Sequence, residues 1–206
     1  DGPERDRAEA LGYTVVDAAT VIATHLNQLL GINAATMLGR SEVRQLIERV
    51  KKDYPDLVDE VVPKPITLAM LTAILGNLLA EQVSIRDMRR ILDALAVHGA
   101  RTTDIDELTA AVRVALGGAI VESWFGANRQ VEVISLDMQL EQMIAQTLTS
   151  GSGLEPGLLE TLVEQTLQAV REQTDRGLPP VLVVRHELRS LLARFLRRSV
   201  ESLVVL

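Results

Sequence analysis

Apolar side chains recur every three or four positions through residues 38–121, a spacing that predicts a run of packed α-helices. Thr67, Ser84 and Asp104 each precede such a stripe, and each has a side chain preferred at the N-cap of a helix. The helix that follows Asp104 is expected to carry one apolar face past Leu116. The pattern therefore predicts an all-helical subdomain.

The pattern becomes mixed over residues 130–206. Residues 131–135 alternate like a strand, residues 181–184 form a short apolar run expected to lie centrally in a sheet, and residues 203–206 are again strand-like. Amphipathic helices separate these segments in the order β-α-α-β-α-β, without a hairpin, so part of the pairing is expected to be parallel. The fold class is a predominantly helical, multi-subdomain α/β protein, in which the all-helical subdomain precedes a small α/β subdomain with a short mixed sheet.

The N-terminal part begins with a charged stretch, followed by strand-like residues 13–16. Asp17 is expected to cap a helix that runs to about Leu30, where residues 31–33 break or bend it. Neither residues 13–16 nor residues 203–206 have a further strand beside them in the sequence, and unpaired strand edges are unfavourable. We therefore expect this chain to be a piece of a longer protein.

Composition restricts the kind of core and the kind of partner. The 206 residues are 47% hydrophobic but only 2% aromatic, so the core must be built from aliphatic side chains, which favours packed helices. The one adjacent aromatic pair, Trp124–Phe125, lies between the two parts and is expected to pack between them. A net charge of −7 argues against a general nucleic-acid surface. No apolar run approaches the roughly 18 residues of a membrane-spanning helix, so we expect no direct membrane insertion by this segment.

Residues that could support catalysis or metal binding are isolated from one another. The chain has no cysteine, which excludes a disulfide framework and a thiolate metal site. His25, His98 and His186 each lack the second histidine that a helical zinc motif requires. The Ser-Gly-Ser-Gly stretch at 150–153 lacks the lysine of a phosphate-binding loop, and we interpret it as a flexible turn. We therefore expect no enzymatic activity and no cofactor.

Five arginines crowd the segment after the second of the three expected strands. They are Arg185, Arg189, Arg194, Arg197 and Arg198. The last three lie opposite the apolar stripe of their helix, as a solvated face does. A nucleic-acid or lipid-headgroup site is disfavoured, because stacking aromatics are absent and acidic residues interrupt the run. We interpret the arginines as solvent-facing, and a protein–protein contact is the main alternative.

The amino-acid sequence of residues 75–95 is the most informative stretch of the chain. It reads Leu-Leu-Ala-Glu-x-Val-x-Ile-Arg-Asp-Met-Arg-x-Ile-Leu from residue 78, and it closely resembles the cytoplasmic region of the FHIPEP (FlhA-like) family of flagellar type III secretion export gates. Further blocks occur in the order of the family and cover nearly the whole chain. These blocks are Gly12–Asp17, Ala23–Asn27, Leu38–Arg40, Glu42–Val43, Asp106–Thr109, Val112–Gly117, Gly153–Leu158 and Arg194–Arg198.

The resemblance implies a docking platform, not an enzyme. Members of the family are multi-pass proteins of the bacterial inner membrane, and their cytoplasmic regions form a nonameric ring beneath the export channel. The implied partners are flagellar export chaperones with their substrates, the export ATPase complex and other export-gate membrane proteins, without nucleic acid.

The resemblance also implies a division into subdomains. Residues 1–16 resemble a remnant of the second subdomain of the family, and residues 17–37 resemble the C-terminal helix of the first. Residues 38–117 resemble the helical third subdomain, and residues 118–206 resemble the α/β fourth, truncated at its C-terminal side.

A partner-docking face is implied on the helix at 17–37. The chaperone-docking groove of the family lies between its first two subdomains, and by similarity its helical wall includes Thr24. Asp17, Val21 and Gln28 share that face by helical spacing. The opposite wall would lie upstream of this chain.

Two other interpretations stay open. The first is the homologous export gate of a virulence-type injectisome, although the wording of Thr14–Asp17 and Ala23–Leu26 favours the flagellar branch. The second is an unrelated helical adaptor or nucleic-acid-binding module. Genomic neighbourhood would decide the first question, and recovery of export chaperones rather than ribosomes from an extract would decide the second.

Overall fold

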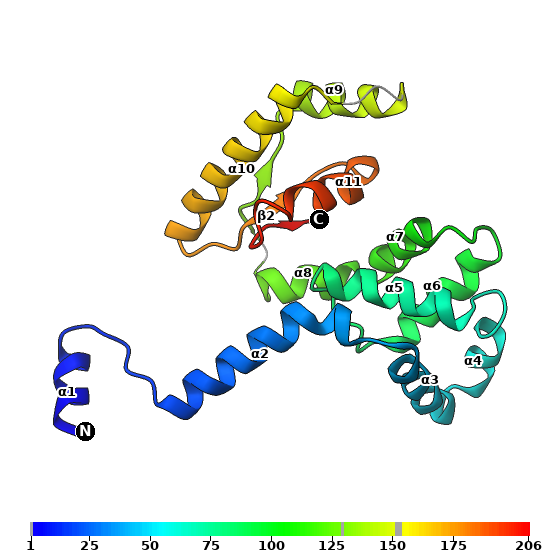
Figure 1. The fold of residues 1–206 in the computed structure, drawn as a ribbon, viewed down its shortest axis with the longest axis horizontal. Helices are drawn as coiled ribbons and strands as arrows, with labels where there is room; N and C mark the ends of the chain where they lie inside the picture. Colours follow the sequence, from blue (N-terminus) through cyan, green and yellow to red (C-terminus); the bar gives the residue numbers. More distant parts are fainter. Residues whose placement is uncertain (1, 129, 151–153) are drawn as a thin grey trace.

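The computed structural model describes residues 2–128, 130–150 and 154–206. Figure 1 shows a long helix, α2, that leads from the N-terminal α1 to a cluster of helices, with an α/β unit beside that cluster. The helices are α1 (Gly2–Ala10), α2 (Ala18–Met37), α3 (Arg40–Asp53), α4 (Pro55–Val61), α5 (Leu68–Ala80), α6 (Met88–Gly99), α7 (Ile105–Ala115), α8 (Gly117–Phe125), α9 (Met138–Thr149), α10 (Pro156–Asp175) and α11 (His186–Leu196). The strands are β1 (Ile134–Ser135), β2 (Val181–Val183) and β3 (Val204–Val205).

Helices α3–α8 enclose the first hydrophobic core. Its members are almost wholly aliphatic, as the lack of aromatic residues led us to expect. The most deeply buried include Val43, Val61, Ile66, Leu71, Ile74, Leu75, Leu78, Ile91, Leu92, Leu95, Leu108 and Val112. This cluster confirms the predicted run of packed helices.

The segment between α5 and α6 differs from the expectation. Ser84 is not the N-cap, because α6 begins at Met88 and the Asp87 side chain accepts a hydrogen bond from the backbone N–H of Arg90. Val83 is buried and Ile85 is half-buried, whereas Ser84 between them is exposed. Two inward side chains at alternate positions require an extended backbone, and this packing delays the start of the helix.

The helix predicted to pass through Leu116 is broken at that residue. Leu116 ends α7 and begins α8, its side chain is buried, and Gly117–Gly118 follow it. Two adjacent glycines disfavour a continuous helix. No single described helix is both long and apolar enough to cross a bilayer; α7 and α8 meet the criteria only when counted together across their 65° bend.

The three described strands form one parallel sheet in the order β1-β2-β3. Ile134 pairs with Leu182, and Leu182 also pairs with Val205, so β2 is central, as predicted. The α/β organisation and the element order are confirmed. The strands are shorter than expected, and every described pairing is parallel instead of mixed. Of the turn predicted at residues 150–153, residues 151–153 lie outside the described residues.

A second hydrophobic core lies between the sheet and helices α9–α11. Ile144, Leu162, Leu188 and Leu196 are among its buried members. Trp124 packs against the first core and also against a small cluster that contains its neighbour Phe125, with Val181 and Val204. The aromatic pair therefore lies between the two units, as predicted.

The N-terminal part departs from the prediction in two ways. Residues 13–16 form no strand, because among the described residues no strand lies beside them to pair with. Helix α2 does not stop near Leu30 but runs through Gly31 to Met37. The Asn33 side chain donates to the Leu29 carbonyl, and the C-terminal part of α2 packs on α5, which stabilises the additional turns.

Candidate functional site

Helix α2 begins at a well-formed cap. The Asp17 carboxylate accepts a hydrogen bond of 2.9 Å from the backbone N–H of Thr20, and its other oxygen accepts one from the Thr20 hydroxyl. These bonds, the hydroxyl first, hold the pKa of Asp17 below its usual range. The cap predicted from the sequence is therefore confirmed, and it places a negative charge at the start of the helix.

Removing this cap should loosen the first turns of α2. In Asp17→Ala we expect faster amide hydrogen exchange at Thr20, because its N–H group loses the carboxylate acceptor. Acid should produce the same effect in the unmodified chain. The pKa of Asp17 is lowered in the folded state, so its contribution is present above the unfolded pKa and is lost as pH falls through the folded pKa. Exchange rates that did not change in Asp17→Ala would contradict the capping role.

The four residues implied as partner-docking lie together on α2. Positions 17, 21, 24 and 28 fall within about 60° of one another around the helix axis. Asp17, Val21, Thr24 and Gln28 are all exposed, and Val21 retains 51% of its surface. The structure therefore displays one polar and aliphatic face on the N-terminal part of α2, which Figure 1 shows extending away from the cluster of helices.

A second, apolar face runs along the other side of α2. Its large side chains are all exposed. They are Ile22, Leu26, Leu29, Leu30 and Met37. No described residue of α2 is buried, and only its C-terminal end, around Ala34 and Ala35, is half-buried near α5. If this apolar stripe were covered, the face formed by Asp17, Val21, Thr24 and Gln28 would still be accessible, because the two lie on roughly opposite sides of the helix.

The two units meet at a cluster of charges around Glu81, which directly follows α5. One oxygen of the Glu81 carboxylate lies 2.7 Å from Arg113 of α7 and 2.7 Å from Arg189 of α11. Its other oxygen lies 3.9 Å from Arg197, which also donates to the carbonyl of Ala80 at 2.7 Å. One carboxylate thus faces three guanidinium groups and joins α5, α7 and α11.

Arg113 is the most buried of these cations, with 6% of its side chain exposed. Its second terminal nitrogen donates to the Val205 carbonyl of β3 at 3.3 Å. Burial lowers the pKa of Arg113 to about 10, against the opposing effect of Glu81. The structural role of this arginine therefore depends on Glu81, because a buried cation needs a compensating charge.

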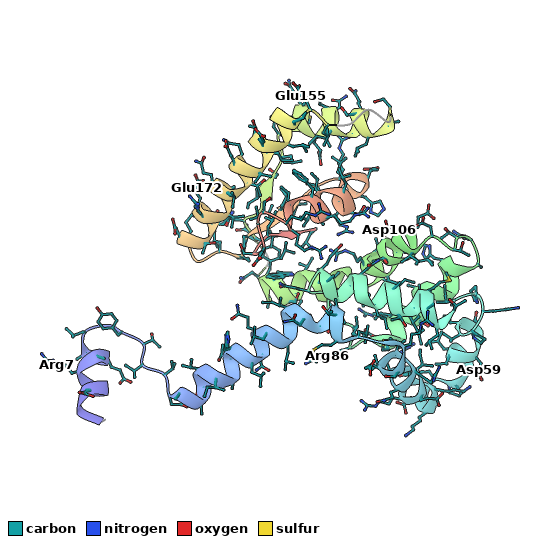
Figure 2. The ribbon with its side chains drawn as sticks, viewed as in Figure 1. Arg7, Asp59, Arg86, Asp106, Glu155 and Glu172 are labelled. Atoms are coloured by element: carbon teal, nitrogen blue, oxygen red, sulfur yellow. The ribbon has the colours of Figure 1, made fainter. Side chains whose placement is uncertain are left out.

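A cleft of about 410 Å³ opens beside this cluster, between α5, α7 and α11. Its charged lining comprises Glu81, Asp106, Arg189, Arg194, Arg197 and Arg198. Arg194 lies 3.4 Å from Asp106, and both side chains are more than half exposed. Asp106 stands at the start of α7, on the side toward α11 (Figure 2).

The interpretation of the basic segment as a solvated face was therefore wrong for Arg189 and Arg197. Arg189 is only 11% exposed and Arg197 is 37% exposed, and both contact the Glu81 carboxylate. Arg194 and Arg198 are exposed, as expected. No local sequence signal reveals the cluster, because Glu81 and Arg189 are 108 positions apart.

The described residues contain no group of three or more metal-ligating side chains close enough to hold an ion. His25 is exposed on α2, His98 is half-buried near the end of α6, and His186 is exposed at the start of α11. The three histidines come from separate elements and share no site.

Comparison with known proteins agrees with the arrangement of the chain. A sequence model described as the FHIPEP family matches residues 1–206, and thus every element above. The chain belongs to the FHIPEP family. The resemblance inferred from residues 75–95 is confirmed. FHIPEP proteins are a transport family, not a known class of enzymes.

Individual FHIPEP relatives extend this result. The flagellar biosynthesis protein FlhA of Salmonella typhimurium is 52% identical over 202 residues, which is 98% of this chain and 29% of the relative. CdsV of Chlamydia pneumoniae, solved in a complex with CdsO, is 28% identical with a TM-score of 0.85, over 98% of this chain and 60% of that one. The nonameric EscV cytosolic domain from a type III secretion system shares the fold, with a TM-score of 0.76 and 24% identity over 90% of this chain and 56% of that one. The chain thus spans less than a third of its FlhA relative.

Proposed function

We propose that this chain is part of the docking platform of a flagellar protein export gate, which receives chaperone–substrate complexes and export ATPase components for type III secretion. The proposal places the chain at the cytoplasmic face of the bacterial inner membrane, as one segment of a multi-pass protein that also contacts other export-gate membrane proteins. The observation that carries it is the exposed face formed by Asp17, Val21, Thr24 and Gln28 on the part of α2 that extends away from the helical cluster.

Three further observations support a binding role. The docking face combines a carboxylate, a hydroxyl and an amide with one aliphatic side chain, as polar interface rims do. The exposed apolar stripe on the opposite side of α2 is of the kind that another subdomain covers. The relative CdsV was solved with a bound protein, CdsO, which supports partner binding by this architecture.

The flagellar branch is favoured over a virulence-type injectisome. Identity to FlhA of Salmonella typhimurium is 52%, whereas identity to EscV of a type III secretion system is 24%. We propose, on the family resemblance, that the chain contributes to a nonameric ring. We also propose the subdomain assignments 1–16, 17–37, 38–117 and 118–206 on the same ground.

Thr24→Arg should weaken docking without unfolding α2. A long cation at the centre of the docking face would obstruct a partner, while Thr24 is exposed and arginine is a good helix former. We expect lower affinity for an export chaperone with its substrate, measured by calorimetry on the full cytoplasmic region of the gene product. Circular dichroism of the variant should be unchanged.

Asn27→Arg provides the matched control. It adds the same charge to the same helix, but at a position to the side of both the docking face and the apolar stripe. It should leave the affinity almost unchanged. Equal affinity for Thr24→Arg and the parent protein would refute the docking face, and a loss of helicity would show that Thr24 has a structural role instead.

A further inference from the structure

The cleft between α5, α7 and α11 has a charge opposite to that of the chain as a whole. The chain has a net charge of −7, yet four of the described lining side chains are arginines and only two are carboxylates. Arg113 adds a further positive charge behind Glu81. The negative charge of Glu81 is shared among three guanidinium groups, so the cleft retains an excess of positive charge.

Unused hydrogen-bond donors line the outer part of this cleft. Each guanidinium has five N–H groups. Arg198 has no hydrogen bond or ion pair within the part of the chain that the structure describes, and Arg194 makes one loose contact to Asp106 at 3.4 Å. Arg189 and Arg197 are fixed by Glu81 and Ala80, so the inner rim of the cleft is already organised. An anion would therefore meet two fixed arginines, the loosely paired Arg194 and the unpaired Arg198 of the described chain.

The two anions already present in the cleft are carboxylates. Glu81 is deeply held, whereas Asp106 is more than half exposed and touches only Arg194 among the described residues. Asp106 thus occupies a position that a stronger external carboxylate could take over, because planar guanidinium groups bind carboxylates through paired N–H donors. The cleft volume of about 410 Å³ suits a few side chains of an extended peptide.

We propose that this cleft is a docking site for an acidic peptide segment of a partner protein, whose Asp or Glu carboxylates bind Arg194 and Arg198. Nucleic acid is a poorer occupant, because no aromatic side chain lines the cleft for base stacking and two carboxylates flank it. The site is separate from the docking face on α2, and its binding can be measured on this chain alone.

The test uses a fluorescein-labelled twelve-residue peptide of alternating Glu and Ser, with a matched Gln–Ser peptide as control. Fluorescence anisotropy should show saturable binding of the acidic peptide only, and the affinity should fall as salt is raised. Arg194→Gln/Arg198→Gln should weaken binding roughly tenfold, because charge-assisted hydrogen bonds are lost. The control variant Arg86→Gln/Arg171→Gln also removes two positive charges, but from outside the cleft. It should change the affinity for the acidic peptide little.

A second variant distinguishes loss of the peptide site from misfolding, because it is expected to strengthen peptide binding. Asp106→Asn removes the internal carboxylate that competes for Arg194, so we expect tighter peptide binding, by a few-fold. No saturable binding, equal binding by Arg194→Gln/Arg198→Gln, or weaker binding by Asp106→Asn would overturn the proposal. So would tighter binding of a thymidine oligonucleotide than of the acidic peptide, since that would assign the cleft to nucleic acid. None of these outcomes depends on the chaperone face of α2.

Discussion

Glu81→Gln is expected to destabilise the junction between the two units by about 3–5 kcal/mol, the usual cost of removing one partner from a buried ion pair. The substitution keeps the shape of the side chain but leaves Arg113 and Arg189, which are 6% and 11% exposed, without their anion. Trp124 lies between the two cores and is the only tryptophan in the chain. Its fluorescence during urea denaturation therefore reports on this junction.

The controls for this prediction come from the same region. Asp106→Asn removes a carboxylate from an exposed pair, so it should cost less than about 1 kcal/mol. Adding Arg113→Met to Glu81→Gln should restore part of the stability, because the more deeply buried of the two uncompensated charges is then absent. If Glu81→Gln unfolded at the same urea concentration as the parent chain, the carboxylate would not be holding the units together.

Leu116→Ala and Leu162→Ala should each cost about 2–5 kcal/mol, one in each core. Leu116 is 2% exposed and fills the corner between α7 and α8, and Leu162 is 4% exposed on α10. Both substitutions remove buried methyl groups and leave a cavity that the surrounding helices only partly fill. Chemical denaturation followed by far-ultraviolet circular dichroism measures the loss.

Leu26→Ala provides the matched comparison, since it makes the same chemical change at a side chain that is 53% exposed. It should change stability by no more than about 0.5 kcal/mol. A shift below about 1 kcal/mol for Leu116→Ala or Leu162→Ala would show that the buried face of that helix is misassigned.

Much of the fold could be predicted from periodicity, because aliphatic stripes record which face of a helix is buried. The stripes identified the helices of both units, and the apolar run at 181–184 identified the central strand. Helix boundaries were less predictable where packing overrides local preference. Ser84 is a good capping residue, yet Val83 and Ile85 require an extended backbone there. Leu116 continues a perfect stripe, yet it lies at a bend.

The sites differ in how much the sequence could reveal. The proposed docking face on α2 follows from helical spacing and from family resemblance, because all four residues lie on one element. The cleft could not be predicted in this way. Its charges come from Glu81 after α5, from α7 and from α11, and only the packing of the two units brings them together. The sequence showed that arginines crowd α11 but not that Glu81 is their partner.

The parallel sheet has a consequence for how the chain acquires its structure during synthesis. The main contacts among helices α3–α7 join helices one or two places apart along the chain. These helices can therefore assemble as soon as they leave the ribosome, because contacts over short sequence separations form quickly. Strand β1 cannot pair until β2 has been synthesised, and β2 cannot pair with β3 until β3 has been synthesised. Helices are translated between these strands. We therefore expect an early intermediate in which the helical unit is compact, while Arg113 still lacks the Val205 carbonyl and Glu81 still lacks Arg189. Until α11 has been synthesised, Glu81 at the end of α5 remains exposed. The second unit then packs against it.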